Sequence, residues 1–122
     1  MDTTFVKLTP DMNVSEAIRL LLENRITGAA VVDDQNRVVG LLSEKDCLQT
    51  LLKGAYDSAP AGTVADYMMT HVVTVTPDIG VFEVTELFLK QVYRRFPVVE
   101  DGVLVGQITR RDLLRFIQNY TA

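Results

Sequence analysis

The chain contains very little of what most small catalytic or metal-binding sites require. Its 122 residues include one cysteine, one histidine and no tryptophan. A single cysteine cannot form an internal disulfide, which fits a reducing cytoplasm, and no zinc-ligand spacing joins Cys47 to His71. No glycine-rich phosphate loop of the form GxxxxGK[ST] occurs. We therefore expect a protein that is not an enzyme, requires no cofactor and holds no metal.

A basic surplus and long apolar runs are also missing. Lysine and arginine number 12 against 16 acidic residues, which gives a net charge of −4. Such a balance argues against nucleic acid as the main partner. No apolar run approaches the ~18 residues of a membrane span, and no secretory signal opens the sequence. We expect a cytoplasmic protein whose chain holds no membrane segment.

The residues that are present form two copies of one pattern. The stretch from Leu8 to Asp34 aligns without a gap with the stretch from Val75 to Asp101, at an offset of 67 residues. The later stretch VGLLSEKDCL, residues 39 to 48, matches VGQITRRDLL, residues 105 to 114, at an offset of 66. Internal repetition of this length indicates a duplicated supersecondary unit. We assign the first repeat to residues 1–53, a linker to residues 54–62 and the second repeat to residues 63–122.

Each copy predicts strand, helix, strand, strand, helix. The expected strands are 5–8, 29–32 and 38–42 in the first copy and 72–75, 96–99 and 103–108 in the second, with a tight turn at Asp101 and Gly102. Asn13 with Glu16 is a candidate cap for the first helix, and Gly80 with Glu83 for its counterpart. The predicted fold is α+β, two tandem β-α-β-β-α repeats that pack through their sheets about a pseudo-twofold axis.

Helical spacing selects the apolar residues that we expect each helix to bury. The set comprises Val14, Ala17, Ile18, Leu21, Leu22, Cys47, Leu48, Leu51 and Leu52 in the first copy, and Val81, Val84, Phe88, Leu89, Val92, Leu113, Leu114, Ile117 and Tyr120 in the second. Cys47 is expected to be a small core residue rather than a nucleophile. His71 is expected at the surface, and Tyr93 and Phe96 in packing.

A hydroxyl and an aspartate three residues apart end the repeated stretch in both copies. Ser43 precedes Asp46 and Thr109 precedes Asp112, each at the expected start of a helix. The same spacing is a helix-capping signature, and Thr63 with Asp66 shows it where no ligand is expected. By itself the motif therefore fits a cap or a binding site.

The whole frame resembles the cystathionine-β-synthase (CBS) domain, and the two copies resemble a CBS pair, or Bateman module. The resemblance covers nearly the whole chain and is most specific in the second copy, in ADYMMT, RRFPVV and TRRD. The first copy departs from it where Ala30 replaces a proline and SEKD replaces TRRD. This resemblance implies a regulatory, energy-sensing module that binds AMP, ADP, ATP or S-adenosylmethionine, with or without magnesium. It also implies a homodimer that modulates a partner protein or a larger parent chain.

By the same resemblance, Asp112 and Asp46 would take ribose hydroxyls, and Thr109 and Ser43 would contact phosphate. A carboxylate suits a ribose diol, and a helix start suits phosphate. The candidate phosphate partners are Arg110, Arg111, Arg94, Arg95 and Lys45, although on sequence alone such arginines are usually solvated. An adenine cleft would use Thr4, Phe5, Val6, Thr27 and Gly28 beside Thr109, and Val72, Val73 and Thr74, with Arg94 and Arg95, beside Ser43.

Two other interpretations stay open. A dimerisation module without a small ligand would have the same repeats, and its aspartates would only cap helices. A small enzyme that used Asp46 and Asp112 as an acid–base pair would need two helix-start carboxylates to meet, and nothing in the pattern raises the pKa of either.

Overall fold

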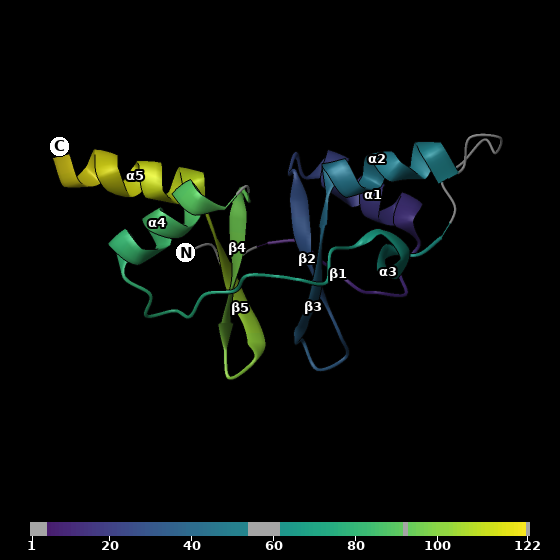
Figure 1. Ribbon diagram of the computed structural model, residues 1–122, viewed down its shortest axis with the longest axis horizontal. Coiled ribbons are helices and arrows are strands. Elements are labelled where there is room, and N and C mark those ends of the chain that lie inside the picture. Colours follow the sequence, from purple (N-terminus) through teal and green to yellow (C-terminus); the bar gives the residue numbers. More distant parts are fainter. Residues whose placement is uncertain (1–4, 54–61, 92, 122) are drawn as a thin grey trace. The chain divides into compact units, whose positions relative to one another are not determined.

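The computed structural model describes residues 5–53, 62–91 and 93–121 (Figure 1). The contacts divide these residues into two compact units. Residues 6–53 and 62–72 form the N-terminal unit, and residues 73–91 and 93–121 with Phe5 form the C-terminal unit. The strand predicted at 5–8 is shorter in the structure, where it comprises Lys7–Leu8. Of the predicted linker, residues 54–61 lie outside the described residues.

The N-terminal unit is a three-stranded sheet with helices packed against it. In chain order it contains β1 (Lys7–Leu8), α1 (Val14–Glu23), β2 (Gly28–Val32), β3 (Val38–Ser43), α2 (Glu44–Lys53) and α3 (Val64–Tyr67). The strand order is β1-β2-β3, with β1 parallel to β2 and β2 antiparallel to β3. The predicted hairpin is confirmed, and its register places Gly28 opposite Ser43.

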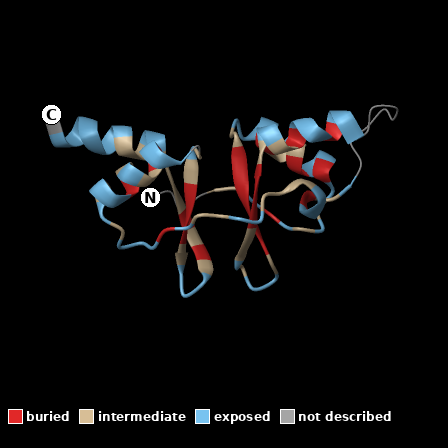
Figure 2. Ribbon diagram, viewed as in Figure 1, coloured by how far each residue is buried: buried red, intermediate tan, exposed pale blue. Residues whose placement is uncertain are grey.

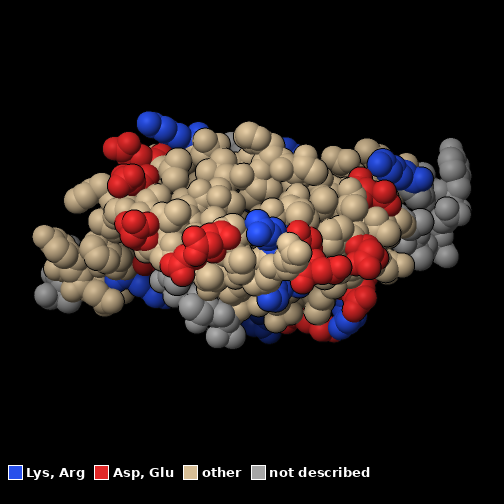
Figure 3. All heavy atoms as spheres, turned by 90° about the horizontal axis from the view of Figure 1, so that it is seen from below, with Lys and Arg blue, Asp and Glu red and all other residues tan. Residues whose placement is uncertain are grey.

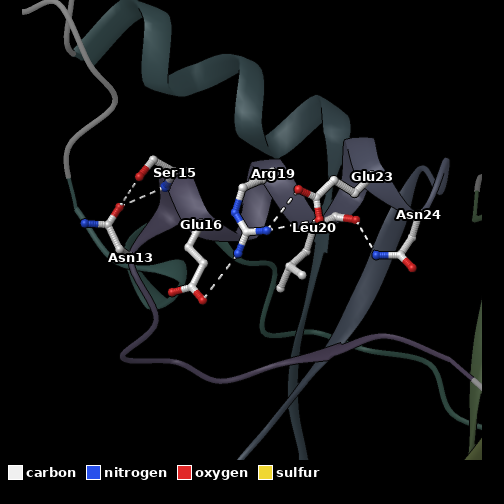
Figure 4. A network of polar contacts seen from close by, with 7 residues as sticks. All are labelled: Asn13, Ser15, Glu16, Arg19, Leu20, Glu23 and Asn24. Carbon is white, nitrogen blue, oxygen red and sulfur yellow. Dashed lines mark hydrogen bonds and ion pairs between the residues drawn. The ribbon is translucent and has the colours of Figure 1, made fainter.

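Helix α1 is fixed at both ends by polar contacts (Figure 4). The Asn13 side chain accepts a hydrogen bond from the Ser15 backbone N–H at 2.9 Å, as an N-cap does. The predicted contribution of Glu16 to this cap is wrong, because Glu16 lies 3.8 Å from Arg19 instead. Arg19 also pairs with Glu23 at 3.0 Å, one helical turn on. At the other end the Asn24 side chain donates to the Leu20 carbonyl at 2.8 Å.

The segment after α3 adds to the sheet of the N-terminal unit. Met69 and Leu41 exchange both backbone hydrogen bonds, each at 2.9 Å. Gly40 makes this approach feasible, because a Cβ built there would lie 2.5 Å from the Met68 Sδ and 3.0 Å from the Met69 carbonyl oxygen. The sequence assigned Thr63 to Met69 to the start of the second repeat, whereas their contacts lie with the N-terminal unit. The repeat boundaries themselves stay a prediction.

The C-terminal unit repeats the arrangement with fewer paired strand residues. It contains α4 (Val81–Lys90), β4 (Arg95–Glu100), β5 (Val103–Thr109) and α5 (Arg110–Thr121), with β4 antiparallel to β5. The predicted strand at 72–75 is reduced to one bridge, in which Val75 pairs parallel with Val98. Thr76 and Pro77 follow at once, and proline lacks the N–H that would extend the ladder. The predicted turn is confirmed, since Asp101 and Gly102 both have positive φ, at 54° and 82°.

Each unit has its own apolar core. In the N-terminal unit the buried residues include Leu8, Val31 and Leu42, with Cys47 buried among them as predicted. In the C-terminal unit Phe96 is fully buried, and its ring lies 4.6 Å from that of Phe88. Tyr93 meets the Phe96 ring edge-on at 6.1 Å, which confirms that both residues serve packing. His71 is exposed, as predicted.

The outward helix faces contain many apolar side chains that were predicted to be buried. The prediction was wrong for Leu22, Leu48, Leu51 and Leu52 on α1 and α2, and for Leu89, Leu114, Ile117 and Tyr120 on α4 and α5, which are all between 55% and 82% exposed. Phe82 is 81% exposed as well. Figure 2 shows the contrast between the buried strands and the exposed helix faces. Helical spacing marks an apolar face, but it does not say whether the same chain covers that face. Val92 lies outside the described residues.

Candidate functional site

The first candidate pair joins the end of β3 to the first turn of α2. The backbone N–H and the hydroxyl of Ser43 both donate to Oδ2 of Asp46, each at 2.9 Å. The Asp46 backbone N–H returns a bond to the Ser43 hydroxyl oxygen at 3.2 Å. Both residues are partly buried. The pair is therefore a reciprocal cap on α2.

The second candidate pair repeats these contacts atom for atom at the junction of β5 and α5. Oδ2 of Asp112 accepts from the Thr109 backbone N–H at 2.7 Å and from the Thr109 hydroxyl at 3.1 Å. The Asp112 backbone N–H donates to the hydroxyl oxygen at 3.3 Å. The duplication seen in the sequence thus extends to individual hydrogen bonds.

Thr63 and Asp66 form a third example at the start of α3. Oδ2 of Asp66 accepts from the Thr63 backbone N–H at 2.8 Å and from its hydroxyl at 3.2 Å, and the two residues complete a capping box. This confirms the capping interpretation for the site where no ligand was expected. Cap geometry is therefore common to all three pairs and does not distinguish a binding site.

The caps limit what each pair can offer a ligand. A hydroxyl has one hydrogen, and Ser43 and Thr109 both use it on a carboxylate. In this state neither hydroxyl can donate to a phosphate. The second oxygen of each carboxylate, Oδ1, takes no part in the cap and is the remaining acceptor for hydroxyl groups.

The hairpins bring other predicted residues next to these pairs, within the same unit. Gly28 is the register partner of Ser43, and the Glu44 backbone N–H donates to the Thr27 carbonyl at 2.8 Å. Likewise Arg95 is the register partner of Thr109, and the Arg110 backbone N–H donates to the Arg94 carbonyl at 3.4 Å. The predicted contacts across repeats, between Thr109 and Thr27 or between Ser43 and Arg94, stay predictions.

The equivalent hairpin positions differ sharply in side chain. Arg95 is partly buried, and desolvation together with the neighbouring charge of Arg94 lowers the pKa of its guanidinium. On sequence alone this arginine was expected to be solvated, and its partial burial differs from that expectation. Its counterpart is Gly28, where an added Cβ would lie 2.9 Å from the Leu42 carbonyl oxygen. The N-terminal unit cannot hold a side chain at this position without a backbone shift.

The remaining basic candidates are exposed. Arg110 and Arg111 occupy the first turn of α5, and Lys45 the first turn of α2 beside the exposed Glu44. On the face drawn in Figure 3, acidic and basic side chains lie among wide uncharged areas, without a continuous basic surface. Of the candidate phosphate partners, only Lys45 belongs to the N-terminal unit, and the four arginines lie in the C-terminal unit, two at the start of β4 or just before it and two in the first turn of α5, close to Thr109.

The candidate adenine-cleft residues are only partly accessible. Phe5, Val6, Val72 and Val73 are partly buried and Thr74 is exposed, while Thr4 lies outside the described residues. Phe5 groups with the unit that holds Thr109, and Val72 with the unit that holds Ser43. Val6, in contrast, groups with the unit that holds Ser43, and Val73 and Thr74 with the unit that holds Thr109. The cleft stays a prediction.

One contact of the candidate site, between Asp112 and Arg115, was not predicted from the sequence. Arg115 Nη1 lies 3.3 Å from Oδ1 of Asp112, one helical turn further along α5. The i,i+3 spacing of opposite charges on a helix was the available signal. Within the described ranges, no cluster of His, Cys, Asp and Glu could hold a metal ion, and no helix has the length and apolarity of a membrane span.

The comparison with family profiles decides the membership of the chain. The CBS domain profile matches residues 1–53 and again residues 64–119. The chain belongs to the CBS domain family. It is a CBS pair with an α+β fold of two β-α-β-β-α-like repeats, as its residues predicted.

Solved CBS structures share this fold over nearly the whole chain. The crystal structure of CBSX2 in complex with AMP has a TM-score of 0.85 and 30% identity, and the match covers 97% of this chain and 90% of that one. CBSX2 is a CBS-pair protein from Arabidopsis thaliana. AcuB from Vibrio cholerae has a TM-score of 0.88 at 26% identity, with coverage of 99% and 88%.

Several curated relatives are much longer proteins. MJ1225 from Methanocaldococcus jannaschii is 29% identical over 96% of this chain, which corresponds to 41% of its own length. Inosine-5′-monophosphate dehydrogenase from Nitrosopumilus maritimus is 29% identical over 87% of this chain and only 21% of its own length. The chain corresponds to the CBS module of such proteins, so the activity of the dehydrogenase is not carried over to it.

Proposed function

We propose that this CBS pair is a regulatory module that binds an adenosine ligand, one of AMP, ADP, ATP and S-adenosylmethionine, and thereby modulates a partner protein. The observation that carries the proposal is the likeness to CBSX2, whose crystal structure contains AMP. If the ligand is AMP, ADP or ATP, the module would act as an energy sensor, because the ratio of these nucleotides reports the energy state of the cell. A ligand acts on a partner only through unequal affinity for two arrangements of the module.

In this proposal Asp46 and Asp112 accept hydrogen bonds from the ribose hydroxyls through Oδ1, the carboxylate oxygen that takes no part in the caps. Phosphate is held by the arginines around Thr109 and by the backbone N–H groups at the helix starts. The Ser43 and Thr109 hydroxyls would contact phosphate only after release from their carboxylates. Magnesium would enter with ATP rather than through protein ligands.

We also propose that the module forms a homodimer through its helices. The exposed apolar side chains lie on α1 and α2 in one unit and on α4 and α5 in the other. Exposed apolar groups in this number are typical of a protein interface. The same observation favours the alternative function, a dimerisation module that binds no small molecule.

A matched pair of variants tests ligand binding. Asp112→Ala and Asp66→Ala each remove a capping carboxylate, and each should lower stability by about 0.5–2 kcal/mol. Only Asp112→Ala removes a proposed ligand contact. The nucleotide-stripped protein would be melted with AMP, ADP, ATP and S-adenosylmethionine, with and without magnesium. A ligand at 100 times its Kd adds about 2.7 kcal/mol, which raises Tm by several degrees.

We expect the ligand-induced rise in Tm to persist in Asp66→Ala and to shrink in Asp112→Ala and in Asp46→Ala. An equal rise in all three variants would show that the aspartates are caps alone. A flat panel in the parent chain, with a concentration-dependent dimer, would support the dimerisation module instead.

A further inference from the structure

We propose that Arg115 makes the two aspartates unequal acceptors, because it occupies the oxygen of Asp112 that a ribose needs. The inference rests on the proposed function and adds a specificity-determining residue to it. The ribose diol would then contribute more to binding at Asp46 than at Asp112.

The capping oxygens are already saturated. An ionised carboxylate oxygen accepts along two lone-pair directions. Oδ2 of Asp112 receives two donors from Thr109, at 2.7 and 3.1 Å. Oδ2 of Asp46 likewise receives two from Ser43, both at 2.9 Å. A diol must therefore place its hydroxyls on Oδ1 in both sites.

Oδ1 differs between the two aspartates. On Asp112 it accepts from Arg115 Nη1 at 3.3 Å, and the Asp112 side chain is only 19% exposed. The residue that follows Asp46 by the same three positions is Gln49, which is exposed and neutral. Within the residues that the structure describes, no ion pair or hydrogen bond to Oδ1 of Asp46 is present. One lone pair more is thus available for a diol at Asp46.

The contact with Arg115 is a competitor rather than a block. The Arg115 side chain is 66% exposed, and solvent weakens such a pair. Exposed ion pairs of this kind change an equilibrium by about two- to fivefold. The expected result is a graded difference between the two sites.

Exchange of the two residues tests the inference. Arg115→Gln gives the C-terminal site the side chain of the N-terminal one, and Gln49→Arg does the reverse. Each would be measured by titration calorimetry in a chain that retains one aspartate, with Asp46→Asn or Asp112→Asn at the other site. The probes are AMP and 2′-deoxy-AMP. Their affinity ratio reports the diol, since any effect of Arg115 on phosphate is common to both and cancels.

We expect Arg115→Gln to raise the ratio at the Asp112 site by about two- to fivefold, and Gln49→Arg to lower it at the Asp46 site by a similar factor. A ratio that stays constant, even if both affinities shift together, would overturn the inference and leave the proposed function intact. Failure of the parent chain to bind either probe would overturn both. Circular dichroism would confirm that each variant is folded.

Discussion

At the scale of single residues, the same hydroxyl–aspartate cap occurs three times in this chain, each time with different neighbours. Ser43 with Asp46, Thr63 with Asp66 and Thr109 with Asp112 all form reciprocal caps. What differs is their surroundings: a half-buried arginine lies opposite Thr109 on the neighbouring strand, and a bare glycine lies opposite Ser43. The spacing of a motif fixes its local bonds, while its neighbours determine what it can bind.

Cys47 gives a prediction at this scale. Burial, reinforced by the charges of Asp46 and Glu44, raises the pKa of its thiol from 9.0 to about 11. Well below pH 9 the thiol is protonated in the folded and the unfolded chain, so its titration does not make stability depend on pH there. Between pH 9 and pH 11 the unfolded chain loses the proton first, and the free energy of unfolding should fall.

Chemical denaturation across this pH range would measure the effect. Cys47→Ala is the control, because lysine and tyrosine also titrate there and their contribution remains in the variant. The parent chain should lose more stability than Cys47→Ala between pH 9 and pH 11. Parallel curves would contradict a buried, protonated thiol, as would rapid alkylation of the native chain near pH 8.

At the scale of elements, short strands depend on neighbours more than on their own residues. The strand predicted at 72–75 keeps only Val75 in a bridge, while Met69 forms an unpredicted bridge with Leu41, and each bridge has two backbone hydrogen bonds. β propensity marks segments that suit a sheet, but pairing depends on which edge is within reach. The valines at 72–75 therefore led to the prediction of a strand that is too long. The pairing of Met69 was not predicted, because two methionines do not indicate a strand.

Gly40→Ala tests that contact. Its new Cβ would meet the Met68 Sδ at 2.5 Å and the Met69 carbonyl oxygen at 3.0 Å, so the Met68 side chain must move and the Met69 backbone must shift slightly away from β3. We expect a loss of about 1–3 kcal/mol in unfolding free energy. Faster hydrogen exchange at the Leu41 and Met69 amides should accompany it.

Gly80→Ala is the matched control. There a new Cβ would meet only the end of the Glu83 side chain, at 3.2 Å, and that side chain can rotate away. Its cost should be limited to the small loss of a good N-cap residue. An equal loss in both variants would mean that Gly40 matters for backbone freedom and not for close approach.

At the scale of the whole molecule, the helices expose many large apolar side chains, and the fold of a single chain gives no reason for this exposure. If they form the homodimer interface, a charge placed there should separate the chains. Leu51→Glu and Ile117→Glu put a carboxylate on α2 and α5, where the parent residues are 71% and 55% exposed. We expect each variant to shift the sedimentation of the protein from dimer to monomer at micromolar concentration.

Gln49→Glu adds the same charge to α2 at an exposed polar position and should leave the dimer intact. Because Leu51 and Ile117 are exposed in the single chain, neither change should reduce the stability of a unit by more than about 0.5 kcal/mol. A parent chain that sediments as a monomer at all concentrations would contradict the interface.

The duplication, the α+β order of elements in each repeat and the CBS family can all be recognised from the amino-acid sequence. The sequence also predicted the two capped helix starts and the buried Cys47, because these follow from local patterns of apolar spacing and hydrogen-bonding side chains. Leu22, Leu51 and Ile117 show that local pattern alone does not predict burial. Their spacing is that of core residues, and only the folded structure shows that more than half of each side chain is exposed.

The atoms of the candidate site that remain available are known only from the folded structure. The i,i+3 spacing allowed a contact of Arg115 with Asp112, and the structure shows that Arg115 Nη1 lies 3.3 Å from Oδ1. At the start of β4 Arg95 is desolvated, whereas the equivalent position at the start of β2 is Gly28, where an added Cβ would lie too close to the backbone. The repeats share a sequence frame, yet packing and charge around each aspartate differ. That difference arises from three-dimensional contacts, and it is where the two halves of the molecule cease to be copies.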